Sequence, residues 1–411
     1  MKGAAIPPSD NLFLPRDERR AENRYAAAKR FFDFDKPLAV AAILLSAIGL
    51  VFIYSASSYS ADLQFGDSFH YVKTQAVALV LGVAAMLSVS FVRPETIAKR
   101  SWLLYAAGIV ALAAVFIPGL GVESYGAKRW LNLGFFTVQP SEYAKFAMVA
   151  ALSAYAAKRG VGTLPRALLY LGIAGVVCLL LLFEPNMSIT VCVGATAFVT
   201  LFASGAKPSH IALILLPVVA AGVGLIIAEP YRVRRLVAFL DPWSSPLDEG
   251  YQLIQSYYAL GSGGLFGVGL FNSRQKYLFL PFAESDFIMS VIGEETGFFG
   301  MILLLALFGV VVVRGYLVAT RASDRFSCYL ATGVTTVIAV QTLMNVAVVC
   351  GAVPPTGLPL PFVSAGGSSL VFYLAAVGML LAVSRRCSAR FPRPLADVVV
   401  RAPHDGGGAG R

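Results

Sequence analysis

Long apolar stretches recur along this chain and constrain its fold more than any other feature. Ten of them reach about 20 residues or more, the length that an α-helix needs to cross a membrane. They lie near residues 37–57, 72–92, 102–118, 139–157, 165–183, 186–204, 209–228, 286–314, 326–350 and 367–384. Hydrophobic residues make up 57% of the 411 residues and charged residues only 14%, a balance outside the soluble range. The sequence therefore predicts an all-α integral membrane protein with about ten transmembrane helices.

The positions of the basic residues predict how these helices are oriented. Lysine and arginine in short loops favour the cytoplasmic side of a membrane. Of the 33 lysines and arginines, 24 lie in the two tails or in the loops at 93–101, 158–166, 205–208 and 314–325. Ten spans place all of these segments on one side, so both termini are expected to be cytoplasmic. Basic tails beside anionic lipid account for most of the net charge of +10, which gives no reason to expect nucleic acid as a partner.

The same pattern predicts three parts of the chain. We expect a cytoplasmic tail over residues 1–36, a polytopic membrane domain over 37–386, and a cytoplasmic, disordered tail over 387–411. One extracytoplasmic connection, at about 229–284, is far longer than an ordinary link between two helices. Loops of this length usually carry function, so we expect the site on this side.

Glu142 and Lys145 stand out because they lie inside a predicted span. They are three residues apart in "QPSEYAKF", so one helix face carries both and they can pair. A buried ion pair can simply hold two helices together. Charges inside a membrane more often mark a pathway or a site, so both interpretations stay open.

The long loop carries its own cations. Arg232 and Arg235 follow the seventh span, where arginines either anchor the chain to lipid headgroups or bind the phosphates of a substrate. The stretch "GYQLIQSYYALGSGGLFGVGLF" is amphipathic and is expected to lie along the membrane interface.

Four carboxylates occur at the head of the eighth span, in "ESDFIMSVIGEETGFFG", and three of them are Asp286, Glu294 and Glu295. From the residues alone, Asp286 is either the N-cap of that helix or a functional acid at its mouth. Glu294 and Glu295 follow more than two helical turns deeper, about 12 to 14 Å along the axis, and are expected to cap or pair with neighbouring helices.

An irregular segment precedes the last span, "PPTGLPLPFVSAGGSSL". Irregular backbone at membrane depth is tolerated where protein buries it or where it lines a cavity. Ser364, Gly367 and Ser368 therefore either contact a ligand or allow tight helix packing.

Cysteines and histidines give no sign of a metal site. The five cysteines show no CxxC pair and the three histidines no ligand spacing, so packing explains the cysteines and a protein-only zinc site is not expected.

Several ordered motifs between about residues 37 and 386 resemble the SEDS family of bacterial cell-wall glycosyltransferases. They include "GAKRWLNLG" with "QPSEYAK", "EPNMS", "FLDPWSSPLDEGYQLIQS", "SRQKYLFLP", "SDFIMSVIGEETGF" and "TGLPLPFVSAGGSSL". Within the family they are most similar to the FtsW branch and its sporulation relative SpoVE, and less similar to RodA. The chain departs from the family where "LPFAESDF" places Phe282 and Glu284 instead of a glutamate and a histidine.

This resemblance implies an activity and a set of site residues. The activity is polymerisation of lipid II, the undecaprenyl-pyrophosphate-linked disaccharide pentapeptide, at the outer face of the bacterial cytoplasmic membrane. Asp286 matches the essential acid of the family, and Glu142 and Lys145 match its functionally important pair. A base is needed for the attacking hydroxyl, and Asp286 is the expected one. The departing diphosphate needs positive charge, for which the candidates are Arg129, Lys145, Arg232, Arg235 and Lys276.

The resemblance also implies partners and leaves some questions open. A class B penicillin-binding protein and other membrane proteins of the division machinery are the expected partners. No cofactor is certain, and a divalent cation, Mg²⁺ or Mn²⁺, stays open. A lipid II flippase is the alternative function, and elongation or sporulation the alternative to division. A flippase should carry polar groups towards both faces of the membrane. Here the polar residues that composition does not explain gather on the outer half of the membrane domain, which favours the enzyme.

Overall fold

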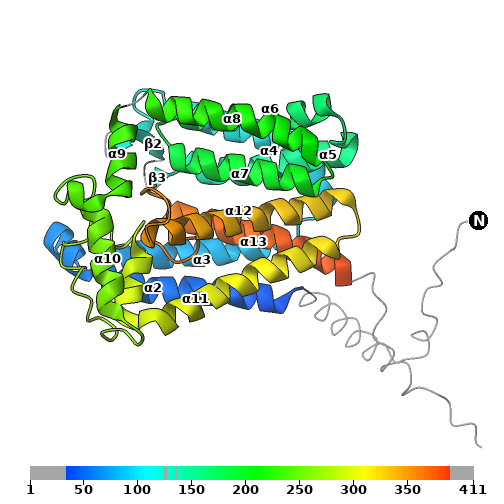
Figure 1. The fold of residues 1–411 in the computed structure, drawn as a ribbon. Helices are drawn as coiled ribbons and strands as arrows, with labels where there is room; N and C mark the ends of the chain where they lie inside the picture. The colour runs from blue at the N-terminus through cyan, green and yellow to red at the C-terminus, as the bar shows by residue number, and fades with distance from the viewer. Residues whose placement is uncertain (1–33, 125–126, 133, 135–136, 229, 389–411) are drawn as a thin grey trace, which may run out of the picture.

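The computed structural model describes residues 34–124, 127–132, 134, 137–228 and 230–388. The long helices of these residues form one bundle (Figure 1), and each of the ten apolar stretches corresponds to one helix, which confirms the all-α prediction. Their bounds are α2 Lys36–Phe65, α3 His70–Ser90, α4 Pro94–Ala114, α5 Pro140–Arg159, α6 Leu164–Phe183, α7 Met187–Ala203, α8 Pro208–Ile227, α11 Ile288–Thr320, α12 Arg325–Val349 and α13 Gly367–Ser388.

Seven of the described helices, namely α2, α3, α4, α6, α11, α12 and α13, are long and apolar enough to cross a membrane. The helices α7 and α8 are apolar but their apolar parts are shorter. The remaining helix, α5, carries charges, and it tolerates them because most of its residues are buried inside the bundle.

The helices form two groups. In Figure 1, α4 to α8 lie above α2, α3, α11, α12 and α13. The second group is joined to the first because α12 packs against α5 and α7. We call the end of the bundle with residues 229–287 the loop end, and the opposite end, where Asp35 and Ser384 lie, the terminal end.

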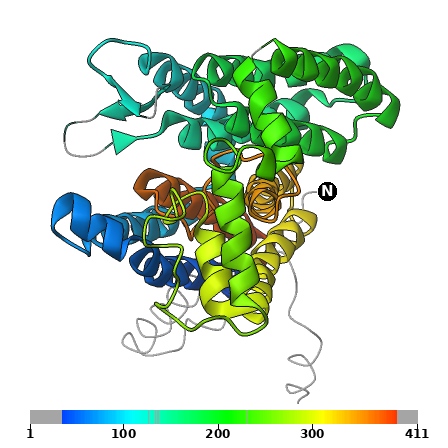
Figure 2. The ribbon, with the colours of Figure 1, turned by 60° about the vertical axis from the view of Figure 1, so that its left-hand side comes forward.

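Short helices cover the loop end. They are α9 Pro230–Leu240, the 3₁₀ turn η2 Pro242–Ser244 and α10 Tyr251–Gly263. Figures 1 and 2 show α9 and α10 running across the bundle axis, as expected for an amphipathic segment at an interface. The buried face of α10 packs against α11, and Gly263 allows this approach, since a Cβ there would lie 2.1 Å from the Gly293 carbonyl oxygen.

A small antiparallel sheet between α4 and α5 departs from the all-helical expectation. Its strands are β1 Gly121–Ser124, β2 Ala127–Asn132 and β3 Thr137–Val138, in that order. In the register, Val122 pairs with Trp130 and Leu131 with Val138. The segment is too short and too polar for a helical crossing, and the sheet satisfies its backbone groups instead.

Several helix boundaries also differ from the expectation. The first span continues to Phe65 rather than 57. The third span begins at Pro94 rather than 102, because Glu95, Lys99 and Arg100 interrupt the apolar pattern without stopping a helix. The eighth begins at Ile288 and continues to Thr320. The two predicted tails lie almost entirely outside the described residues.

Candidate active site

Asp286 lies in the last turn of the long loop, directly before α11. The N-cap of α11 is Phe287, so Asp286 does not cap the helix, and that alternative is wrong. The Asp286 main-chain oxygen accepts a hydrogen bond of 2.8 Å from the Asn345 side-chain amide. Its side chain is half-buried and faces Gly357, where a Cβ would lie 3.3 Å from the Asp286 Oδ2. The site therefore keeps this carboxylate at the surface of the loop end with little room around it.

Burial and the nearby Glu284 carboxylate raise the pKa of Asp286 to about 6, although Arg129 and a hydrogen bond from Ser285 act in the opposite direction. Burial also raises the pKa of Glu284. A carboxylate with such a pKa is ionised at neutral pH but is a stronger base than an ordinary aspartate.

The irregular segment before α13 holds the Asp286 loop in place. The Ser364 hydroxyl donates a hydrogen bond of 2.5 Å to the Ser285 carbonyl oxygen and accepts one of 2.8 Å from the Leu360 amide. The Ala365 amide donates to the Glu284 carbonyl oxygen at 2.9 Å. Ser364 was predicted as a substrate contact, and the structure uses its hydroxyl to join two loops.

Lys145 lies at the centre of a buried polar cluster next to this segment. Its ammonium group contacts Glu142 Oε1 at 3.0 Å, Gln341 Oε1 at 2.6 Å and the Tyr373 hydroxyl at 3.1 Å. Both charged side chains are fully buried, with no exposed area, so the predicted pair on one helix face is confirmed. The other Glu142 oxygen accepts from the Ser369 hydroxyl at 3.0 Å.

Two polar residues of α12 connect the Lys145 cluster to Asp286. Gln341 contacts Lys145 and donates a hydrogen bond of 2.9 Å to the Pro359 carbonyl oxygen. Asn345, one helical turn further, donates to the Leu358 carbonyl oxygen at 2.7 Å as well as to Asp286. Sequence reasoning missed both residues. The signal was present, since two amides four residues apart in the apolar "VIAVQTLMNVAVV" lie on one face.

Gly367 and Ser368 lie at the beginning of α13. The Ser368 hydroxyl accepts a long hydrogen bond of 3.4 Å from the Gln139 amide, just before α5. A Cβ on Gly367 would meet Ala78 at 3.5 Å, which is ordinary contact. These contacts join α13 to α5 and α3, so in the structure the two residues serve helix packing.

Strand β2 brings Arg129 to the same end of the bundle. Its guanidinium donates to the main-chain oxygens of Glu184, at 3.3 Å, and Pro185, at 2.6 Å. These carbonyls belong to the turn between α6 and α7, and just after it the Ser188 hydroxyl, at the start of α7, donates a hydrogen bond to the Thr356 carbonyl oxygen. The turn, Arg129 and the irregular segment therefore meet beside Asp286.

Glu184 is a third residue that the sequence did not single out. It is 1% exposed, and among the described residues neither of its carboxylate oxygens has a hydrogen-bond partner. Burial raises its pKa to about 8, and the charge of Arg129 lowers it. An acid of this kind near Asp286 changes the local charge when it ionises.

Lys276 belongs to another cluster. Its ammonium group lies 3.6 Å from Glu295 Oε1 and donates a hydrogen bond of 2.5 Å to the Phe271 carbonyl oxygen. Glu294 accepts from the Arg274 amide at 3.0 Å and the Ser273 hydroxyl at 2.5 Å. Pairing with a neighbouring transmembrane helix is confirmed for Glu295, which accepts a hydrogen bond from Ser55 of α2, whereas these partners of Glu294 belong to the long loop.

The two remaining predicted cations lie on α9. Arg235 is exposed, and the side chain of Arg232 lies outside the described part of the structure. Their assignment to substrate stays a prediction.

The described residues contain no group of three or more His, Cys, Asp and Glu side chains that could hold a metal ion. A divalent cation would therefore need substrate phosphates as additional ligands, as Mg²⁺ commonly does.

Comparison with known proteins identifies the family of this chain. A family model for FtsW, RodA and SpoVE, described as "Cell cycle protein", matches residues 36–389. Stage V sporulation protein E of Bacillus subtilis is 40% identical over 85% of this chain and 97% of its own length. The probable peptidoglycan glycosyltransferase FtsW of Geobacter metallireducens is 38% identical over 86% of this chain and 95% of its own.

A solved structure extends the likeness to three dimensions. One chain of a peptidoglycan synthase complex, described as coordinating polymerisation and crosslinking, superposes with a TM-score of 0.72. It is 29% identical and the match covers 86% of this chain and 98% of that one. The chain described here belongs to the FtsW/RodA/SpoVE family of multi-pass membrane proteins.

Proposed function

We propose that this chain is a peptidoglycan glycosyltransferase that polymerises lipid II at the outer face of the bacterial cytoplasmic membrane. The names of its relatives support the activity, since the FtsW proteins that match over most of their length are named probable peptidoglycan glycosyltransferases. The observation that carries the proposal is Asp286: a carboxylate with a raised pKa, in a loop held at the loop end by α12 and by the irregular segment before α13.

In the proposed reaction, Asp286 removes the proton from the acceptor sugar 4-hydroxyl as its oxygen attacks the anomeric carbon of the donor. The bond from that carbon to the diphosphate breaks, and the undecaprenyl diphosphate leaves with the electron pair. A positioned base typically contributes about 10²- to 10⁴-fold in rate. The leaving group is already a weak base, so it needs positive charge rather than a second acid. Arg129, whose charge lowers the pKa of Asp286, is the cation that we propose for this role.

Lys145 and Lys276 have a different part in this proposal. Both are buried, with side-chain exposures of 0% and 5%, and each is paired with a glutamate. We therefore assign Lys145 to positioning: through Gln341 it holds the Pro359 carbonyl and the segment that faces Asp286. Lys276 fixes the long loop to α11 and α2, because it also contacts Ser55 at 3.5 Å.

The partner is proposed to be a class B penicillin-binding protein, with other membrane proteins of the division machinery nearby. The support is the likeness to a chain of a synthase complex that coordinates polymerisation with crosslinking. Division is favoured over elongation because FtsW proteins are among the relatives, and sporulation is the alternative because SpoVE is another.

The experiment uses purified protein in detergent with labelled lipid II, alone and with the penicillin-binding partner. In micelles no membrane separates two compartments, so a flippase produces no change in lipid II. A ladder of glycan strands is the expected result. If lipid II stays monomeric in both samples while the same protein moves it across vesicle membranes, the chain is a transporter.

A further inference from the structure

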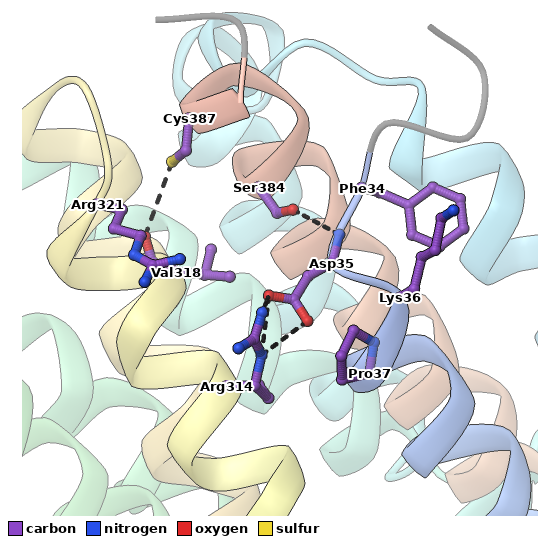
Figure 3. A pocket seen from close by; sticks show the side chains of 9 residues that line it. All are labelled: Phe34, Asp35, Lys36, Pro37, Arg314, Val318, Arg321, Ser384 and Cys387. Carbon is purple, nitrogen blue, oxygen red and sulfur yellow. Dashed lines mark hydrogen bonds and ion pairs between the residues drawn. The ribbon is translucent and has the colours of Figure 1, made fainter. Parts of the chain in front are cut away.

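Two cavities open at the terminal end of the bundle, and they differ in how their charges are balanced. The first, of about 530 Å³, lies where α2, α11 and α13 meet (Figure 3). Its central Arg314 binds Asp35 through two nitrogens, at 3.0 and 2.6 Å. The Asp35 amide donates to the Ser384 hydroxyl at 2.8 Å. This cavity is therefore built around an ion pair that joins three helices.

The second cavity, of about 480 Å³, lies at the turn between α5 and α6. It is lined by three cations and by no carboxylate: Tyr155, Lys158, Arg159, Pro165, Arg166 and Leu169. All three cations are exposed, and none forms an ion pair with any residue that the structure describes. Other cations at this end do pair, as Arg314 with Asp35 and Arg386 with Glu95. Three like charges around one hollow repel each other, and an anion within it removes that repulsion.

The shape of the neighbouring surface indicates what kind of anion fits. Leu169 lines the cavity and is 51% exposed, and Val176 and Phe183, each seven residues further along α6, are 47% and 66% exposed. Residues seven apart lie on one helix face. This apolar stripe is about 21 Å long at 1.5 Å per residue, close to the length of an extended acyl chain. The cavity thus continues into a surface suited to hydrocarbon.

We propose that this cavity binds the phosphate headgroup of an anionic membrane lipid, with one acyl chain along Leu169, Val176 and Phe183. Arg166 can hold two phosphate oxygens at once, and Lys158 and Arg159 add point attraction. The cavity lies at the end that the basic residues assign to the cytoplasm, where anionic lipid is enriched. The proposal does not depend on the polymerase activity, since the cavity is at the opposite end of the bundle from Asp286.

The test is a titration of the full-length protein in a neutral detergent with fluorescent phosphatidylglycerol, phosphatidylcholine and inorganic phosphate. Each basic residue near an anionic lipid contributes roughly a fivefold gain in affinity. Arg166→Gln should therefore weaken phosphatidylglycerol binding about fivefold, and the triple change of Lys158, Arg159 and Arg166 to glutamine about a hundredfold. Arg166→Lys keeps the positive charge and should keep part of the affinity. This variant therefore distinguishes an effect of the lost charge from an effect on folding.

Lys207→Gln is the matched control, because Lys207 is an exposed cation at the same end of the bundle and outside both cavities. It should leave binding unchanged. An equal loss in Lys207→Gln, equal binding of phosphatidylcholine, or binding of inorganic phosphate as tight as that of the lipid would each overturn the proposal. Thermal unfolding of every variant shows whether a loss of binding reflects a loss of fold.

Discussion

The amide of Asn345 is the most informative group to change, because one side chain supports two parts of the candidate active site. It donates to the Asp286 carbonyl at 2.8 Å and to the Leu358 carbonyl at 2.7 Å, and it is only 1% exposed. The change Asn345→Asp keeps the size of the side chain but replaces the donor by an acceptor. Both carbonyls then face a carboxylate oxygen instead of an N–H group.

The size of the effect follows from these contacts. A buried polar group that loses its partner costs about 1–3 kcal/mol, so two carbonyls cost about 2–6 kcal/mol. A protonated carboxyl restores one donor at most, so at least one carbonyl stays without a partner unless the Asp286 loop moves away from α12. A shift of about 1 Å in a reacting group costs on the order of 10²-fold in rate. We therefore expect Asn345→Asp to lower the rate of glycan polymerisation at least about a hundredfold, and to lower the thermal unfolding temperature.

Thr342→Val is the matched control for this change. Thr342 lies on the same helix and is buried, and its hydroxyl has no hydrogen-bond partner among the described residues. Its replacement should leave the rate within about threefold of wild type. The assay is the initial rate of glycan ladder formation from labelled lipid II, measured beside thermal unfolding. A rate for Asn345→Asp within about threefold of wild type would refute the positioning role.

Three further predictions concern charge. The pKa of Asp286 is raised to about 6, and the base must be unprotonated to act. The polymerisation rate should therefore rise with pH through about 6 and level off above it. A rate that falls over this range contradicts the assignment. Lys145→Met leaves Glu142 buried without its cation, which should lower the free energy of unfolding by about 3–5 kcal/mol. Adding Glu142→Gln to this variant should restore part of the lost unfolding temperature. Glu294→Gln removes the charge and replaces one of the two oxygens that accept from the loop by an NH₂ group, so hydrogen exchange around residues 273–276 should increase; unchanged exchange would show that the loop does not depend on this carboxylate.

The composition and the length of the apolar stretches were enough to predict the helices. A membrane helix needs about 20 apolar residues, and few other backbone structures can cross a membrane. The same criterion placed the start of α4 too late, since the charged first turns of that helix carry no apolar signal. The sheet at 121–138 was missed because three strands of two to six residues give too few positions for a pattern.

The candidate site was predictable only where one segment contains both partners. Glu142 and Lys145 are three residues apart, so helix geometry alone predicted their contact. Asn345 lies 59 residues from Asp286 along the chain, and Gln341 lies 196 from Lys145, so only the packing of α12 brings them together. Lys276 shows the opposite case: a lysine near Asp286 in sequence is turned by the loop towards Glu295.

The central claim is that the Asp286 carboxylate accepts the proton of the attacking hydroxyl. The most direct measurement compares Asp286→Asn with wild type in the ladder assay with purified partner, at equal protein amounts and with folding checked by thermal unfolding. We expect a folded Asp286→Asn protein that binds lipid II but forms no strands, because the amide has the same shape and cannot take up the proton. Strands formed at the wild-type rate would contradict it.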